Sequence, residues 1–144
     1  MRINFELIRD LLLIIENEST TIHGVLFVDS SEMANAVHEA LGDTIHRDLP
    51  AYQKDLESKF TLDEIKYHLN YCIKAELIYD KDKNFSPDIY IPDLTVKGHE
   101  YINLIREKSH WEKLKEFLNK AKEPLTIEAI TLAGERLLNS ALGS

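Results

Sequence analysis

Hydrophobic residues recur at the spacing of an α-helix along much of this chain. Over residues 5–15 they occupy almost the whole circumference of a predicted helix, which is typical of a helix buried in a core or at a dimer seam. The clearest helix of the first half opens at Thr61, because Thr61 and Glu64 form a capping-box pattern ahead of an apolar stripe. Shorter helices are predicted over residues 31–41 and after Pro50.

Between these helices the pattern changes to short runs of β-branched and aromatic residues. One such run predicts a strand over residues 21–28, and another predicts a short strand over residues 77–79. The polar, turn-rich residues 81–88 separate the second strand from an antiparallel partner over residues 89–94. Helix, strand, loop and strand in this order are typical of a helix followed by a β-wing.

A threonine and a glycine stand at the head of the next amphipathic run. Thr95 is expected to cap that helix, and Gly98 to allow close backbone approach where the helix crosses the sheet. Ser109 and Glu112 repeat the capping-box pattern, so we expect the chain to break there before a second helix. A last helix is predicted after a cap at Thr126.

Together these elements predict an α+β, mostly α fold. We interpret residues 1–108 as a winged helix-turn-helix with a small β-wing, and residues 109–144 as a C-terminal helical pair. Residues 21–60 are more than such a domain usually places between its first helix and the helix at the recognition position, so they are interpreted as an insertion. At 144 residues the chain has the size of one compact domain with this extension.

The cysteine count and the lengths of the apolar runs indicate where in the cell the protein is expected. A single cysteine, Cys72, excludes an intramolecular disulfide and a cysteine cluster for zinc, which fits a reducing, cytoplasmic location. Charged residues interrupt the apolar start of the chain, and no run approaches the roughly eighteen apolar residues of a membrane helix. We therefore expect a soluble protein with no membrane association.

The net charge of −8 disfavours a broad DNA-binding surface, because phosphates must be met by lysines and arginines. The helix from Thr61 to Glu76 carries two positive and three negative residues, and aspartates offset the lysines of the wing. Tyr67 and Tyr71 lie one helical turn apart, which favours a protein-binding patch. The face expected to bind a partner or DNA consists of Lys66, Tyr67, Asn70, Tyr71, Lys74, Lys81 and Lys83.

A basic stretch follows later in the chain. From Arg106 to Lys122 there are six positive and three negative residues, a net charge of +3. Several of the cations repeat every seven residues and so flank the apolar face of the predicted helix. This pattern fits a solvated helix packed through its apolar face, or contact with nucleic acid or an acidic partner. Its candidate binding residues are Arg106, Lys113, Lys115, Lys120 and Lys122.

No residue pattern typical of catalysis emerges. The six histidines include no closely spaced ligand pair, and Cys72 falls on an apolar stripe. The sequence also contains no nucleophile elbow, phosphate loop or paired-carboxylate motif. We therefore expect a protein that is not an enzyme and that uses no metal and no cofactor.

Four stretches of the sequence resemble one family of small bacterial proteins: NFELIRDLLLIIE, EIKYHLNYCIKAELI, LTVKGHEYINLIREKSHW and LTIEAITLAGERLL. The family is frequent in phages and prophages and is catalogued as domain of unknown function 2513. The resemblance implies a winged-helix-like fold and a phage or mobile-element setting, and it brings no established activity. Many winged-helix regulators end the recognition-position helix with glycine, whereas this chain has Glu76 there.

Two functions follow from these observations. The favoured one is a non-catalytic winged-helix adaptor or regulator of phage or prophage origin, which binds a protein partner that the host can encode. It is expected to form a homodimer through its first helix or its C-terminal pair. The alternative is a sequence-specific DNA-binding transcriptional regulator, which the charge disfavours. Clustering of the lysines on one face would favour DNA, and their dispersal would favour the adaptor.

Overall fold

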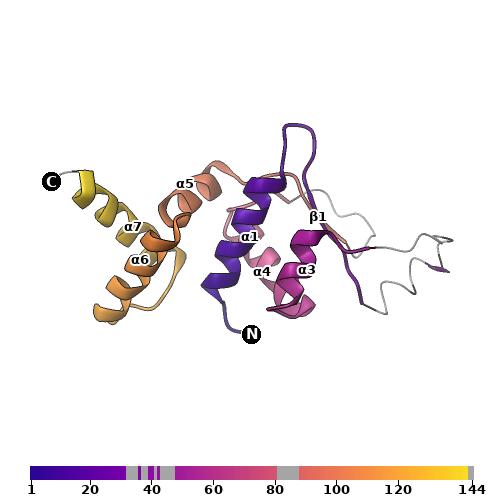
Figure 1. Ribbon diagram of the computed structural model, residues 1–144, viewed down its shortest axis with the longest axis horizontal. Helices are drawn as coiled ribbons and strands as arrows, with labels where there is room; N and C mark the ends of the chain where they lie inside the picture. Colours follow the sequence, from indigo (N-terminus) through magenta and orange to yellow (C-terminus); the bar gives the residue numbers. More distant parts are fainter. Residues whose placement is uncertain (32–35, 37–38, 41, 43–47, 81–87, 143–144) are drawn as a thin grey trace.

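The computed structural model describes residues 1–31, 36, 39–40, 42, 48–80 and 88–142 (Figure 1). The described part is mostly helical with one small two-stranded antiparallel sheet, which confirms the predicted α+β, mostly α class. Figure 1 shows an elongated molecule, with α1, α3 and α4 near the sheet and with α6 and α7 at the opposite end. The elements are α1 (Phe5–Glu18), β1 (Val25–Phe27), α3 (Ala51–Glu57), α4 (Leu62–Lys74), β2 (Ile89–Ile91), α5 (Val96–Ile105), α6 (Lys108–Lys120) and α7 (Ile127–Leu142).

Helix α1 lies in the centre of the core. The Asn4 side chain caps it by accepting hydrogen bonds from the backbone N–H groups of Glu6 and Leu7. The helix packs against α4 and α5. Its apolar circumference is therefore explained by burial within the chain, and the dimer seam allowed by its sequence is not available. The buried α1 side chains are Phe5, Leu7, Ile8, Leu11, Leu12 and Ile15.

A buried histidine ties the start of α1 to α4. His68 is fully buried, and its Nε2 accepts a hydrogen bond from the backbone N–H of Asn4 at 2.8 Å. Its Nδ1 lies 2.7 Å from the carbonyl oxygen of Glu64. Because a backbone N–H only donates, Nε2 is the accepting nitrogen, and Nδ1 is the nitrogen placed to donate to the Glu64 carbonyl. His68 is thus a core residue of α4.

The sheet joins segments that are far apart in the sequence. β1 and β2 pair antiparallel, with Val25 opposite Ile91 and Phe27 opposite Ile89. The predicted pairing of residues 77–79 with the segment after the wing loop is only partly right. It consists of one antiparallel bridge between Ile78 and Leu94, and this register reaches the residues beyond β2 rather than β2 itself.

Side chains of α3 cover the outer edge of β1. Gln53 is completely buried, and its amide group pairs with both backbone groups of Val28. Its Oε1 accepts from the Val28 N–H at 2.8 Å, and its Nε2 donates to the Val28 carbonyl at 2.6 Å. The hydroxyl of Tyr52 donates to the carbonyl of Leu26 at 2.5 Å. These contacts bring both ends of the predicted insertion into the fold, while most of the helix predicted over residues 31–41 lies outside the described residues.

Helix α5 begins where the backbone passes against Leu77. Thr95 Oγ1 accepts from the Gly98 N–H at 2.9 Å, which confirms the predicted cap. A Cβ atom at Gly98 would lie 2.0 Å from the Leu77 carbonyl oxygen, so no larger residue fits there. The close approach predicted for this glycine is therefore present.

Helix α4 ends in a Schellman motif whose left-handed residue is Glu76, with φ of 63°. The Leu77 N–H donates to the carbonyl of Cys72 at 2.9 Å, and the Glu76 N–H donates to the carbonyl of Ile73 at 3.0 Å. The chain thus adopts the backbone of a glycine-terminated helix without the glycine. The Cβ atom of Glu76 makes this left-handed conformation strained.

Replacing Glu76 by glycine is expected to raise the free energy of unfolding by about 0.5–1 kcal/mol, because glycine adopts positive φ without a Cβ clash. Urea denaturation would measure the change. Glu100 is a matched control, because it is an exposed glutamate inside α5. Glu100→Gly is expected to lower stability by about 1 kcal/mol. A loss of stability in Glu76→Gly would contradict the strain assigned to this position.

The break between α5 and α6 falls earlier than predicted. α6 begins at Lys108 after Glu107, whose side chain makes no capping bond, so the capping box predicted at Ser109 is wrong. The reason is a tertiary contact, since Arg9 donates to the carbonyl oxygens of Ile105 at 2.8 Å and Arg106 at 2.6 Å and thereby ends α5.

Helix α7 begins after the predicted cap, where Thr126 Oγ1 accepts from the Ala129 N–H at 3.0 Å. It packs against α5 and α6. In the part of the chain that the structure describes, no helix combines the length and the hydrophobicity needed to cross a membrane.

Candidate functional site

The outward side of α4 brings several predicted binding residues onto one face. Tyr67, Asn70, Tyr71 and Lys74 follow helical i, i+3, i+4, i+7 spacing. Tyr67 is 44% exposed, Asn70 and Lys74 are exposed, and Tyr71 is half-buried. Partial burial raises the pKa of Tyr71, so its hydroxyl stays protonated near neutral pH. We call these four residues the α4 face.

Lys66 lies beside the α4 face, but its ammonium group forms an ion pair with a carboxylate of the same chain. Its Nζ is 2.7 Å from Oδ2 of Asp29, which is only 5% exposed. Burial alone would raise the pKa of Asp29, but hydrogen bonds from Lys66 and from the Ser31 N–H outweigh burial and lower it. Lys66 therefore neutralises a buried carboxylate and is not a free cation for a phosphate.

The N-terminal end of α4 is closed and acidic. The Thr61 side chain accepts from the Glu64 N–H at 3.1 Å, and the Glu64 carboxylate accepts from the Thr61 N–H at 3.1 Å, which confirms the predicted capping box. Asp63 is exposed in the same turn. A helix N-terminus attracts phosphate through free N–H groups, but here a carboxylate already occupies one of these groups.

The basic stretch of α5 and α6 is largely neutralised by carboxylates of the same chain. Lys115 pairs with Glu6 of α1 and lies 3.2 Å from Glu112. Lys120 lies 3.0 Å from Glu116. Lys113 and Lys122 form no ion pair with a described residue, and the wing residues Lys81 and Lys83 lie outside the described residues.

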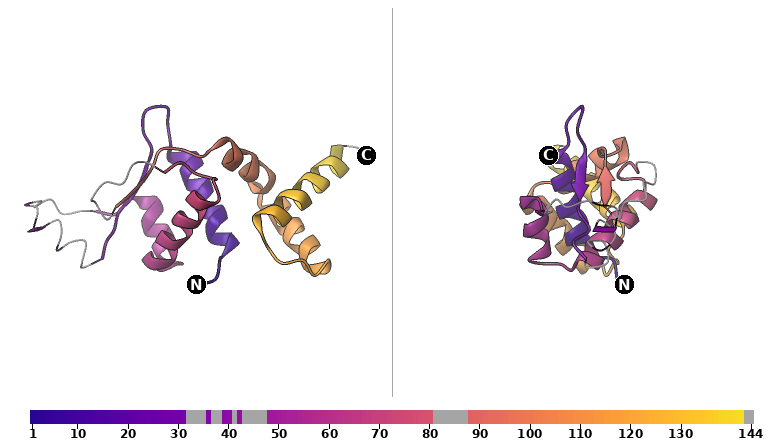
Figure 2. Two further views of the ribbon diagram at one scale, coloured as in Figure 1. Left: turned by 180° about the vertical axis from the view of Figure 1, so that it is seen from behind. Right: turned by 90° about the vertical axis from the view of Figure 1, so that its right-hand side faces the viewer.

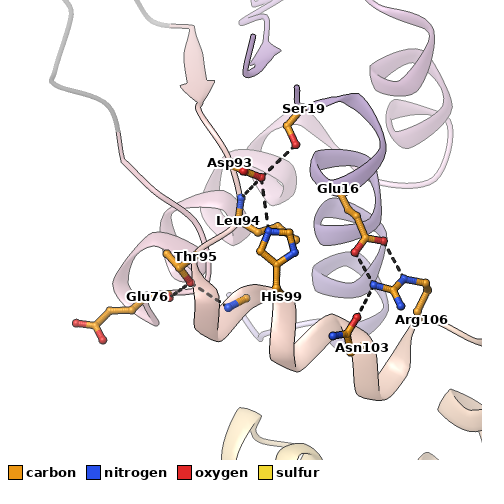
Figure 3. Close-up of polar contacts among 10 residues, drawn as sticks. Glu16, Ser19, Glu76, Asp93, Leu94, Thr95, His99, Asn103 and Arg106 are labelled. Carbon is orange, nitrogen blue, oxygen red and sulfur yellow. Dashed lines mark hydrogen bonds and ion pairs between the residues drawn. The ribbon is translucent and has the colours of Figure 1, made fainter. Parts of the chain in front are cut away.

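Arg106 belongs to a polar cluster that joins the end of α1 to α5 (Figure 3). Its guanidinium donates two hydrogen bonds to the Glu16 carboxylate, at 2.8 and 2.6 Å. These bonds lower the pKa of Glu16 and raise that of Arg106, so the pair is charged at neutral pH. Both charges are therefore used to hold the two helices together.

The same cluster contains a serine, an aspartate and a histidine that do not form a catalytic triad. Asp93 Oδ1 accepts from Ser19 Oγ at 3.1 Å and from the Leu94 N–H at 2.7 Å, and it lies 3.9 Å from His99 Nε2 (Figure 3). A triad needs the histidine between the other two, whereas here the aspartate is in the middle. No group of three or more metal-binding side chains is found among the described residues.

Cys72 is buried in the core, and burial raises the pKa of its thiol to about 12. The reactive thiolate is therefore disfavoured at neutral pH, and the side chain acts as a small hydrophobe.

An additional exposed surface, which sequence reasoning missed, lies between α6 and α7. A groove there is lined by Phe117 of α6, by Ala121 directly after α6, and by Ala129 and Leu132 of α7. Phe117 is 41% exposed and Leu132 is 55% exposed. The helical spacing in both segments predicted amphipathic helices, but it did not indicate which apolar residues stay outside the core.

Comparison with known protein families gives a match over most of the chain. A family model described as a hypothetical protein, DUF2513, matches residues 2–124. No curated protein and no solved structure matches the chain.

Proposed function

Because the chain belongs to the domain of unknown function 2513 family, whose description states no activity, we propose a function from its geometry. In this proposal the protein is a non-catalytic winged-helix adaptor or regulator of phage or prophage origin, which acts in the cytoplasm. The α4 face of the protein binds a protein partner, which the host can encode.

The order of elements supports a winged helix. α1, β1, α3 and α4 are followed by the Ile78–Leu94 bridge and by β2, which pairs with β1. In such a domain α4 occupies the recognition position. The resemblance of the sequence to a phage-associated family supports the origin, and the single buried cysteine fits a reducing compartment.

The chemistry of the α4 face carries the proposal of a protein partner. This face presents an exposed tyrosine and an asparagine, while the neighbouring Lys66 is used by Asp29. Tyrosine is enriched where proteins meet proteins, because it combines a large apolar area with a hydrogen-bonding group. A DNA-binding helix instead needs free cations around its base contacts.

The arrangement of the cations favours the adaptor over the DNA-binding alternative. Figures 1 and 2 show α4 and α6 on opposite sides of α1, along the length of the molecule. The α6 helix, with its lysines, therefore lies apart from α4, the helix that carries Lys74. The DNA alternative is supported by Asn70, which is exposed at a position where asparagine can bind adenine.

Tyr67→Ala is expected to weaken binding to the protein partner at least tenfold, because exposed aromatic residues contribute about 2 kcal/mol or more at the centre of an interface. The partner would be captured from host extract with the full chain, purified, and titrated against each variant by calorimetry. Lys74→Ala is the matched control on the same face, with less than about a threefold change expected. If Lys74→Ala abolishes binding and Tyr67→Ala leaves the affinity unchanged, the proposal fails.

A further inference from the structure

Helix α7 has a second face that its own chain does not cover. Its inner face packs on α5 and α6 through Ile130 and Ala133, which are buried. On its outer side, Glu128, Leu132 and Arg136 are exposed and follow one another at intervals of four residues. Figure 2 shows α7 at the end of the molecule, away from α3 and α4, so a second protein can approach it freely.

We call Glu128, Leu132 and Arg136 the α7 ridge. The charges on this ridge are complementary to those of the same ridge in a second copy of the chain. Glu128 precedes Leu132 by four residues, and Arg136 follows it by four residues. If two α7 helices pack antiparallel about a two-fold axis at Leu132, each Glu128 meets Arg136 of the second copy and the two leucines meet at the axis. The two ion pairs would lie about 12 Å apart along the helix. Neither Glu128 nor Arg136 forms an ion pair with another described residue.

The groove beside the ridge supplies an apolar surface for the same contact. Phe117, Ala121 and Ala129 line the groove on the Leu132 side of α7. We propose that the chain forms a homodimer through antiparallel pairing of its α7 helices, with Leu132 at the two-fold axis and with Glu128–Arg136 ion pairs on both sides. This inference is independent of the proposed function of the α4 face.

The contact is small, so the dimer is expected to form at roughly micromolar concentration rather than at nanomolar concentration. Light scattering and analytical ultracentrifugation of the full chain, from low to high micromolar concentration, would measure it. Leu132→Glu is expected to weaken dimerisation at least tenfold, because two carboxylates would meet at the axis. Leu138→Glu is the matched control, since Leu138 is also exposed on α7 but does not line the groove.

Charge reversal tests the antiparallel register itself. Glu128→Arg and Arg136→Glu are each expected to weaken self-association at least tenfold, because each dimer would then contain two like-charge pairs. An equimolar mixture of these two variants is expected to recover the affinity of the wild type, since both ion pairs are then complementary. Circular dichroism confirms that each variant is folded. A wild-type chain that stays monomeric would overturn the proposal. So would a wild-type dimer with no recovery in the mixture.

Discussion

Replacing Gly98 by alanine is expected to lower the free energy of unfolding by more than about 3 kcal/mol. The added Cβ atom would lie 2.0 Å from the carbonyl oxygen of Leu77 and 3.0 Å from its carbonyl carbon. Both are backbone atoms, and that oxygen also accepts a hydrogen bond from the Thr95 N–H at 3.0 Å. The clash can be relieved only by moving α5 away from the end of α4, which opens the core.

Gly134→Ala is the matched control, because Gly134 is also a buried glycine within a helix. Its Cβ atom would lie 3.1 Å from the Cβ atom of Leu104, a contact that a shift of a few tenths of an ångström relieves, and alanine favours a helix over glycine by about 1 kcal/mol. We therefore expect a change within about 1 kcal/mol of the wild type. Urea denaturation measures both variants. A Gly98→Ala protein as stable as Gly134→Ala would show that the close approach at Leu77 does not constrain the fold.

The second large effect is expected at Gln53. Gln53→Met keeps a side chain of similar length but removes both hydrogen bonds to the backbone of Val28. Each backbone group left buried without a partner costs about 1–3 kcal/mol. The free energy of unfolding is therefore expected to fall by about 3 kcal/mol, with faster hydrogen exchange at the Val28 amide.

Lys54→Met serves as the control for this substitution, because Lys54 is the exposed neighbour of Gln53 on α3. Its stability is expected to stay within about 0.5 kcal/mol of the wild type. If both variants lose the same small amount of stability, then the edge of β1 does not depend on the amide of Gln53.

Local features of the fold could be predicted from the sequence because their causes lie within a few residues. The capping box at Thr61, the cap at Thr95 and the tight glycine at Gly98 all depend on short-range geometry, and all three are present. The α+β, mostly α class follows from the same periodicities.

Features that depend on distant contacts could not be predicted in this way. The strand β1 pairs with β2 across more than sixty residues, and the break before α6 is set by Arg9 rather than by Ser109. In the candidate site, the ion pairs of the basic stretch likewise depend on residues that are distant in the sequence. The positive charge of this stretch is evident in the sequence, but the carboxylates of Glu6 and Glu16 that neutralise much of it belong to α1.

In the proposed function, the α4 face binds a protein and not DNA. The most direct test of this proposal is binding of the purified full chain to a pool of genomic and phage DNA fragments, from about 50 to 200 mM salt. We expect no fragment to be selected, with at most weak binding that is equal for all fragments. Selection of one fragment, with affinity that falls steeply with salt and is lost in Lys74→Ala, would contradict the account and identify a DNA-binding regulator.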